Sequence, residues 1–577
     1  MVCSRNTWRA GSALAVFLAA TVASPAFAQT DRSGKGGLDY GLPQVRKINE
    51  EIRRVWTDHQ LSPSPPATDA EWCRRVYLDV LGRIPSVAEL REFLASREAD
   101  KKAKLVNKLL HDDQGTKERE PYATTYARNW ATIWTNLLIG RNGGLERRTL
   151  ISRDGMLKYL RDSFARNKPY DKMVFELVTA TGSTEPGEPD FNGAVNFLVG
   201  KLDENAAQAT AMTSKIFLGL QVQCTQCHNH PFNEWKQQKF WEFNAFFRQT
   251  RAIARRVPGA REVESAQLVN QDFEGEGAAR GSGEGANEAI IYYELRNGLL
   301  QSAFPVFIDG TEISKSGRLS ECDRRTELGK LIVNSPYMDK TIVNRMWQHF
   351  LGYGFTKPVD DLGPHNTPSH PELLDYLAAE LRNNSFNLKE LIRWIVLSEP
   401  YGLSSKITNQ NKADDPLLGE SPKFSHFYLR QMRAEELYES LLVATEAHKT
   451  GLSEEERARL KSAWLDQFVI AFGTDEGDET TTFNGTIPQA LMMFNGDLIK
   501  KAISADKGSF LQQVAASNLK PADKIQYLFE AGLSRRPTQN EANVSNQLLA
   551  ARKGDLAAAL QDVFWAILNS NEFILQH

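Results

Sequence analysis

Apolar residues recur at intervals of three and four positions along most of the chain, which is the spacing of amphipathic helices. The pattern predicts helices from about Pro43 to Phe247, with breaks at proline or glycine. Gly82 is expected to end one of these helices, and Ser86 with Glu89 forms a capping box for the next. The two helices should therefore meet at a tight turn.

The part of the chain from Arg324 onward shows the same helical period. Ser369 and Glu372 have the spacing of another capping box, with Pro371 tolerated in the first turn. The helices predicted here include residues 326–333, 339–351, 371–383, 388–397 and 431–444.

The segment between these helical regions has a different composition. Arg248 to Arg261 holds five arginines without helical periodicity, and Asp272 to Glu288 is rich in Gly, Glu and Ala, so both are predicted to be loop. The arginines are interpreted as a solvated face, with anion binding as the alternative. Residues 290–295 and 304–308 flank a turn at 296–298 and predict a small hairpin.

Together these patterns predict a mainly α fold. Two helical domains, at residues 43–250 and 321–577, would be joined by a small β-hairpin-containing insert and the Gly/Glu-rich loop at 251–320. A chain of 577 residues exceeds the size at which a single core stops growing, which supports more than one domain.

Two short stretches of sequence occur twice in similar form. Residues 82–86 with Glu89 are similar to residues 534–538 with Glu541, and residues 392–398 are similar to residues 563–570. No fixed short period links the copies, so a solenoid is not predicted. Recurrent helix-pair chemistry explains the similarity.

The first 28 residues have the features of a secretory signal peptide. Arg5 and Arg9 form a basic start, residues 10–23 are apolar, and Ala26-Phe27-Ala28 is a small-x-small cleavage site. A membrane anchor is disfavoured because the apolar run is shorter than the roughly 20 residues of a spanning helix. We expect cleavage near Ala28, a periplasmic or secreted protein, and no transmembrane segment in the mature chain.

The charge balance narrows the choice of partners. The chain carries 69 Lys and Arg against 72 Asp and Glu, a formal net charge of −3. Removal of the signal would take away two arginines and no acidic residue, and leave a linker at residues 29–42. This balance argues against a nucleic-acid-binding protein.

One short motif carries recognisable chemistry. Cys224, Cys227 and His228 have the Cys-x-x-Cys-His spacing at which two thiols add to the vinyl groups of haem and the histidine becomes the proximal iron ligand. Covalently attached haem c is therefore the leading interpretation. Two alternatives stay open. One is a zinc site in which His230 joins these three residues, and the other is a disulfide or free dithiol without a cofactor.

The remaining cysteines of the mature chain, Cys73 and Cys322, lie far apart in the sequence. In an oxidising compartment they could pair and tie two domains together. Sequence does not establish whether their Cα atoms approach within bonding distance, so this pairing stays open.

A second axial ligand for the iron would have to come from elsewhere in the chain. Met212 precedes the motif, and His349, His365 and His370 follow it; a packed methionine or a surface histidine is the alternative for each. The aromatic residues after the motif have helical spacing, which favours a core role and is compatible with burying a haem edge. They are Phe232, Trp235, Phe240, Trp241, Phe243, Phe246 and Phe247.

Two blocks of sequence resemble known families. Residues 77–86 and 215–235, with Phe247, resemble the planctomycete-type cytochrome-associated domain DUF1549. A second block resembles its usual partner domain, DUF1553, and consists of Arg324-Arg325, residues 343–347, Asp360-Asp361, and residues 369–374, 433–435 and 568–573. Such proteins are large, exported and often found with c-type cytochrome domains, and no reaction is settled for them. The resemblance implies that this protein is also exported and associated with c-type cytochromes.

The resulting hypothesis is an exported haem-containing redox protein. It would transfer electrons to or from a partner protein, or assist the oxidation of a substrate such as a polymer. Polar residues that could form a substrate site are Arg345, His349, Asp360, Asp361, His365 and His370, with solvation or helix capping as the alternative. The rival is a non-enzymatic extracytoplasmic interaction or structural protein with a disulfide or zinc staple. A hydrolase is disfavoured because neither Gly-x-Ser-x-Gly nor His-Glu-x-x-His occurs.

Overall fold

The fold is taken from a computed structural model of the chain. The structure describes residues 39–116, 119–146, 148–231, 233–256, 259, 263–276, 288–449, 453–473 and 486–577. The predicted signal peptide and most of the Gly/Glu-rich loop lie outside these residues.

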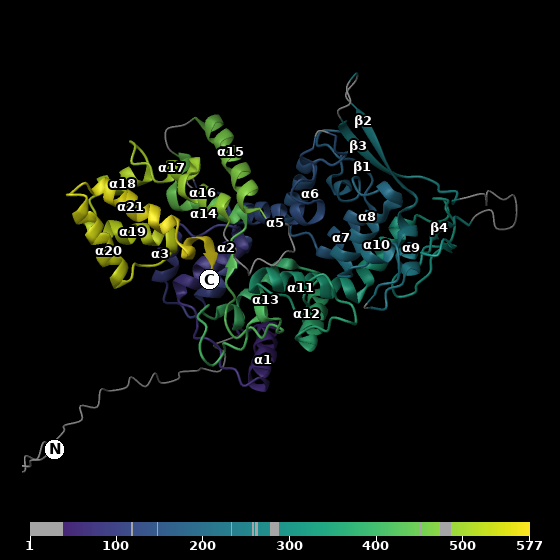
Figure 1. Cartoon of the computed structure of the whole chain (residues 1–577), viewed down its shortest axis with the longest axis horizontal. Coiled ribbons are helices and arrows are strands. Elements are labelled where there is room, and N and C mark those ends of the chain that lie inside the picture. Colours follow the sequence, from purple (N-terminus) through teal and green to yellow (C-terminus); the bar gives the residue numbers. More distant parts are fainter. Residues whose placement is uncertain are drawn as a thin grey trace, which may run out of the picture. The chain divides into compact units, whose positions relative to one another are not determined.

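Helices make up most of the described chain, which confirms the mainly α fold (Figure 1). The helices before the predicted insert are α1 (Pro43–Asp58), α2 (Asp69–Leu81), α3 (Val87–Ala95), α4 (Lys101–His111), α5 (Tyr122–Ile139), α6 (Arg153–Ala165), α7 (Tyr170–Thr179), α8 (Asp203–Thr213) and α9 (Gln237–Asn244).

The helices after the insert are α10 (Arg324–Asn334), α11 (Pro336–Leu351), α12 (Pro371–Asn383), α13 (Leu388–Val396), α14 (Ala434–Thr445), α15 (Glu454–Phe472), α16 (Ile487–Asn495), α17 (Asp497–Ala502), α18 (Phe510–Ala516), α19 (Pro521–Leu533), α20 (Gln539–Ala551), α21 (Leu556–Leu568) and α22 (Asn571–Ile574). The helix predicted at 371–383 coincides with α12, and the one predicted at 431–444 begins later, at α14.

The turn after α2 forms as predicted. Gly82 has a φ of 72°, and its amide donates to the carbonyl of Leu78, which ends the helix. The Ser86 side chain accepts from the Glu89 amide, and the Glu89 carboxylate accepts from the Ser86 amide, so the capping box is complete. Arg83 pairs with Glu89 at 2.8 Å and holds the turn to the new helix.

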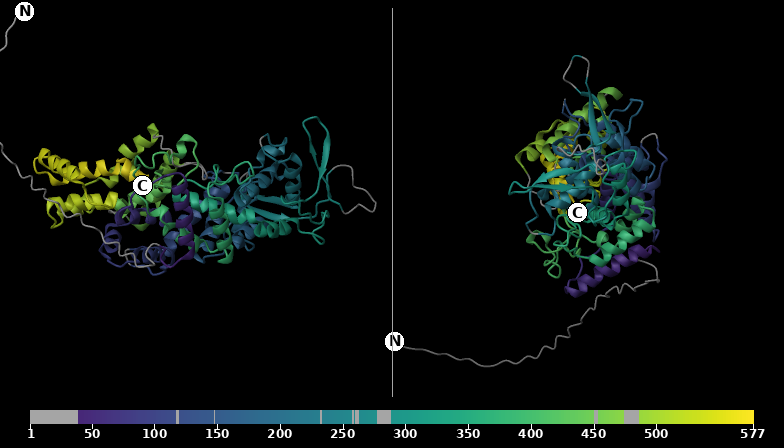
Figure 2. Two further views of the ribbon diagram at one scale, coloured as in Figure 1. Left: turned by 90° about the horizontal axis from the view of Figure 1, so that it is seen from below. Right: turned by 90° about the vertical axis from the view of Figure 1, so that its right-hand side faces the viewer.

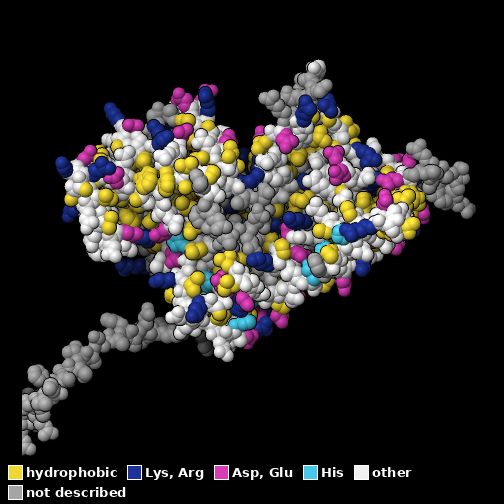
Figure 3. Space-filling model, in the orientation of Figure 1, with side chains coloured by type: hydrophobic (Ala, Val, Ile, Leu, Met, Phe, Trp, Pro, Cys, Tyr) yellow, Lys and Arg dark blue, Asp and Glu magenta, His cyan; other side chains and the backbone are white. Residues whose placement is uncertain are grey.

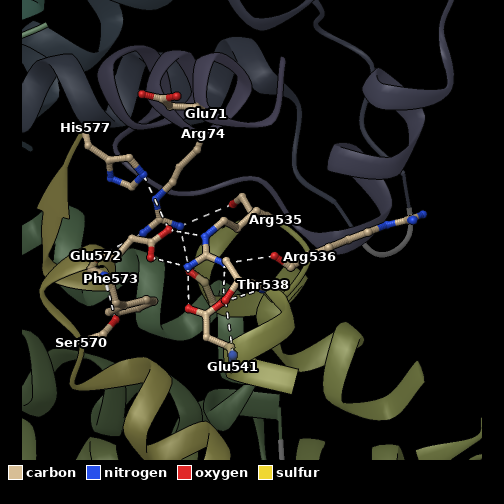
Figure 4. A network of polar contacts seen from close by, with 12 residues as sticks. Glu71, Arg74, Arg535, Arg536, Thr538, Glu541, Ser570, Glu572, Phe573 and His577 are labelled. Atoms are coloured by element: carbon tan, nitrogen blue, oxygen red, sulfur yellow. Dashed lines mark hydrogen bonds and ion pairs between the residues drawn. The ribbon is translucent and has the colours of Figure 1, made fainter. Parts of the chain in front are cut away.

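The similar sequence at 534–541 forms the same kind of turn (Figure 4). Ser534 ends α19 with a φ of 56°. Thr538 and Glu541 form the capping box of α20, and Arg535 pairs with Glu541 at 2.8 Å. Arg535 also pairs with Glu572 at 2.6 Å. The two similar sequences therefore share the backbone turn, the capping box and the Arg–Glu ion pair.

The capping box predicted at Ser369 and Glu372 is wrong. Helix α12 begins at Pro371, its N-cap is His370, and no side chain caps it. Ser369 lies one residue too early to serve as the N-cap, and its hydroxyl instead makes a 2.9 Å hydrogen bond with Nδ1 of His370.

The strands of the described chain are short and antiparallel. They are β1 (Gly182–Ser183), β2 (Thr250–Arg256), β3 (Val263–Asn270), β4 (Ile291–Glu294), β5 (Leu300–Ala303), β6 (Arg430–Gln431) and β7 (Leu575–Gln576). One sheet has the order β1-β3-β2, and β4 pairs with β5 and β6 with β7. The β2–β3 ribbon extends away from the neighbouring helices (Figure 2).

The sheet β1-β3-β2 corrects the prediction that the arginine-rich segment is loop. Ile253 of β2 pairs with Gln267 of β3, and the side chains of Arg251, Arg255 and Arg256 are exposed. A strand with so many charged residues lacks the β-branched and aromatic composition that marks strands in a sequence. The interpretation of these three arginines as a solvated face is confirmed.

The predicted hairpin is present, but its second arm lies earlier than expected. Ile291 pairs with Ala303, so the second strand is β5 and not residues 304–308. The chain reverses tightly because the Leu295 amide donates to the Leu299 carbonyl at 2.9 Å and Gly298 adopts a φ of 80°. The polar residues of β5 give no strand signal in the sequence.

Two large hydrophobic clusters form the core. The first extends from α1 to Tyr428, so α10 to α13 pack with the amino-terminal helices. The second joins residues of 432–574 to Leu78 of α2, Val87 of α3 and Ile84 of the turn between them. Arg74 strengthens this junction by donating to the carbonyls of Gly532, at 2.7 Å, and of Phe573, at 3.2 Å.

The cysteines of the described chain are all free thiols, so the Cys73–Cys322 pairing that the sequence left open does not form. Cys73 is buried within the first cluster, and burial raises the pKa of its thiol. Cys322 lies directly before α10 and is also buried. Among the described helices, none combines the length and apolar character needed to cross a membrane.

Candidate functional site

The Cys-x-x-Cys-His motif follows a sharp end to a helix. Helix α8 continues into a π-helical turn, Ser214–Leu218, which Gly219 closes with a φ of 63°. A Cβ at Gly219 would lie 2.7 Å from the hydroxyl of Thr341 and 2.9 Å from a methyl of Leu362. Glycine is thus required here both by the backbone conformation and by the close approach of α11. The Cys-x-x-Cys-His motif lies just after this glycine, beginning at Cys224.

The motif itself is a short 3₁₀ turn, Gln223–Gln226, held in place by α9. The Gln226 carbonyl accepts one hydrogen bond from the Gln237 side chain and one from the Trp241 indole, each at 3.1 Å. The side-chain oxygen of Asn229 accepts a hydrogen bond from the backbone amide of Gln237 at 3.0 Å. These contacts fix the loop that carries the chemistry, and the motif alone gave no indication of them.

The two thiols of the motif are exposed, whereas the residue between them is not. Cys224 and Cys227 are free and exposed. Thr225 is buried, and its hydroxyl donates to the Val222 carbonyl at 2.6 Å. Because Thr225 anchors the turn inward, both sulfur atoms remain accessible to a reagent from solution.

His228 is oriented by its neighbour. Its Nδ1 lies 2.7 Å from the carbonyl oxygen of Asn229. A carbonyl can only accept a hydrogen bond, so Nδ1 carries the proton and Nε2 of the neutral ring presents a lone pair. This is the tautomer in which histidine ligates iron or zinc through Nε2, with the second nitrogen held by a backbone carbonyl.

A loop after α11 lies against the motif. The Gln221 side chain donates to Asp360 at 2.7 Å, and Lys215 pairs with Asp360 at 3.3 Å. His365 pairs with Asp361 at 2.8 Å, and the rings of His365 and His230 have centroids 6.2 Å apart. Residues separated by more than a hundred positions are thus brought together on both sides of the motif, at Gln221 and at His230.

Two family models match this chain. Residues 47–252 match DUF1549 and residues 324–549 match DUF1553, both described as proteins of unknown function. The chain is a DUF1549–DUF1553 protein. Searches of curated proteins and of solved structures found no match. In this DUF1549–DUF1553 protein, Asp360 and His365 are DUF1553 residues that contact the motif-bearing end of the DUF1549 domain.

Other DUF1553 residues proposed for a substrate site lie elsewhere. His349 is half-buried against Trp130, with its Nε2 3.2 Å from the Asp79 carbonyl. Desolvation and the nearby Arg433 and Arg430 hold its pKa well below the ordinary value. His349 and Arg345 line the same pocket.

His370 of the DUF1553 domain is packed beside Phe355 and Phe424. Burial lowers the pKa of His370 to about 4. On the DUF1549 side, Met212 packs against the large hydrophobic cluster. The alternative of a packed methionine therefore describes Met212, whereas the alternative of a surface histidine is wrong for His370, which is buried.

The aromatic residues after the motif belong mainly to the protein core of the DUF1549 domain. Phe240, Phe243, Phe246 and Phe247 are each at most 2% exposed, and Trp235 is 8% exposed. Trp241 is half-buried and stacks on Tyr293 with centroids 5.9 Å apart. Phe232 lies outside the described residues. The predicted core role is confirmed.

Cys224, Cys227, His228 and His230 are the four ligands of the zinc alternative. Within the described ranges, no three His, Cys, Asp or Glu side chains are grouped as a metal site. Two exposed thiols directly before an imidazole are the groups that covalent haem attachment requires.

Proposed function

We propose that this protein is an exported electron-transfer protein that carries one haem c on the thiols of Cys224 and Cys227, with His228 as axial ligand. The proposal rests on one observation: both thiols are exposed on a single turn, directly before a histidine whose Nδ1 is held by the Asn229 carbonyl. Thioether bonds form between cysteine sulfur and the haem vinyl carbons, so both thiols must be accessible.

The chain's own residues would do three things for such a group. Cys224 and Cys227 would fix it covalently, and His228 would bind the iron through Nε2. The hydrogen bond from Nδ1 to the Asn229 carbonyl would keep the ring in one orientation and raise its basicity as a ligand. When bound, haem supplies a one-electron redox couple whose potential depends on the axial ligands.

The surface beside the motif supports a docking role for a redox partner. Near the exposed turn, the half-exposed side chain of Lys215 pairs with the buried Asp360, and His365 pairs with Asp361. Over the visible face of the molecule, basic and acidic side chains are interspersed (Figure 3). Mixed charge of this kind suits a protein or polymer partner better than nucleic acid.

The test is expression with the signal sequence in a host that has haem-attachment machinery. We expect Soret and α bands in the purified protein, and a mass increase of one haem that survives denaturation. Replacing Cys224 and Cys227 together by serine should remove the covalent haem, and His228→Ala should shift the absorption bands. The matched control is Cys322→Ser, which removes a thiol away from the motif and should retain haem.

The outcomes separate the proposal from its rival. A protein without Soret bands, and with zinc or no metal by elemental analysis, would favour the structural or interaction role. His365→Ala also belongs in the series, because a changed spectrum would identify His365 as the second axial ligand.

A further inference from the structure

A pocket lies between α5, α11 and the segment from β6 to α14. It is partly open to solvent, and its cavity volume is about 90 Å³. Trp130, Ile133 and Leu137 of α5 form an apolar wall, and Arg345 of α11 faces the same space. Arg430 and Arg433 complete the lining from the β6–α14 segment. The family match gives no role to this pocket.

The charges around the pocket do not balance. Arg430 is ion-paired with Asp79, and Arg433 is paired with Glu436 at 2.7 Å. Arg345 has Nε and Nη2 buried without a hydrogen-bond partner. Three guanidinium groups thus face two carboxylates, and the unmatched positive charge belongs to Arg345. His349 adds no second charge, because burial and the nearby arginines hold its pKa well below the ordinary value.

The unpartnered polar atoms of the pocket-lining residues are all hydrogen-bond donors. They are Nε1 of Trp130, Nε and Nη2 of Arg345, Nε of Arg430 and Nε2 of Gln431. Arg430 is the most deeply placed of the arginines, with 7% of its side chain exposed. Buried donors without acceptors carry a desolvation cost. A group that offers only acceptors and a negative charge would satisfy them together.

We propose that this pocket binds a small organic oxyanion, with its carboxylate, sulfate or phosphate group on Arg345 and Gln431 and an apolar or planar body against Trp130. Arginine suits this role because its planar fork matches the oxygen atoms of such groups. The apolar wall of α5 favours an organic anion over an inorganic one, since burial of an apolar body adds to the binding free energy. The proposal is independent of haem attachment.

The test is isothermal titration calorimetry on the mature full-length protein. The probes are benzoate, phenyl sulfate and phenyl phosphate, with benzyl alcohol as the neutral analogue and inorganic sulfate and phosphate as the bare anions. We expect at least one aromatic anion to bind more tightly than its inorganic counterpart, and benzyl alcohol not to bind. The best of the three aromatic anions identifies the oxyanion group that the site prefers.

Variants assign the binding to the pocket. Arg345→Met should weaken binding of that anion by about tenfold or more, since a charged hydrogen bond is lost. Arg552→Met is the matched control, because Arg552 is an exposed arginine paired with Asp562. This variant should bind the anion as tightly as the wild type does. Thermal unfolding without ligand should show Arg345→Met at least as stable as the wild type, because it removes a buried unpaired charge.

Three results would overturn the proposal. The first is that none of the three aromatic anions binds, or that benzyl alcohol binds as tightly as they do. The second is equal affinity of Arg345→Met and the wild type. The third is a lower unfolding temperature of ligand-free Arg345→Met, which would show that Arg345 serves the fold itself.

Discussion

Arg430 and Asp79 form an ion pair although 351 positions separate them in the chain. Asp79 belongs to α2 of the DUF1549 domain, and Arg430 begins β6 of the DUF1553 domain. Asp79 is 1% exposed and also accepts a hydrogen bond from the Tyr401 hydroxyl at 2.7 Å. The pair therefore joins the two domains inside the protein, where neither charge can be solvated.

Replacing Asp79 by asparagine should destabilise the protein strongly. The change leaves Arg430 buried without its counter-charge, which costs about 3–5 kcal/mol when one partner of a buried pair is lost. The measurement is the free energy of unfolding from urea denaturation. The matched control is Asp562→Asn, which breaks the more exposed pair with Arg552 and should cost less than about 1 kcal/mol. Equal losses in both variants would contradict the role given to Asp79.

Gly219→Ala should disturb the motif as well as the fold. The residue has a φ of 63°, and its new Cβ would lie 2.7 Å from Thr341, so both backbone strain and a clash oppose it. We expect a loss of about 1–3 kcal/mol from the backbone conformation alone. Limited proteolysis should cut near residues 219–230 more rapidly. Gly402→Ala is the control, because nothing lies within 4 Å of its Cβ position, and it should leave both readouts unchanged.

The network around Arg535 predicts a specific loss of stability in acid. Its hydrogen bond holds the pKa of Glu541 at about 2, below the ordinary 4.5. Glu541 therefore stabilises the fold fully above about pH 4.5, and this contribution disappears as the pH falls towards 2. Arg535→Ala should lower the unfolding temperature at neutral pH, and its curve should approach the wild-type curve near pH 2. Parallel curves over this range would show that the pair is unimportant.

His370 predicts a second pH dependence. Burial lowers its pKa from 6.5 to about 4, so the unfolded chain binds a proton that the folded protein rejects between these values. Its contribution to stability is present above about pH 6.5 and is lost as the pH falls to 4, by about 3 kcal/mol in all. Unfolding temperatures measured from pH 7 to 4 should fall less steeply for His370→Gln than for the wild type. The same slope in both proteins would exclude His370 as a source of this dependence.

Local signals in the sequence determined the helical part of this protein well. The turn at Gly82, the capping boxes at Ser86 and Thr538, and the bounds of α12 depend on residues within one or two turns of each other. The same holds for the Cys-x-x-Cys-His motif, because its three reactive side chains are adjacent in the chain. Such features are encoded by spacing alone.

The tertiary structure decided what surrounds these local features. The sheet β1-β3-β2 pairs Gly182 with Leu268, and a strand of two residues leaves no periodic signal. Asp360 contacts Gln221, and the ring of His365 lies beside that of His230, on either side of the motif. Arg430 and Arg433 pair with Asp79 and Glu436, whereas Nε and Nη2 of Arg345 have no partner. Contacts of this kind depend on the packing of distant segments, so a single sequence determined the elements and the motif, and the fold alone determined their partners.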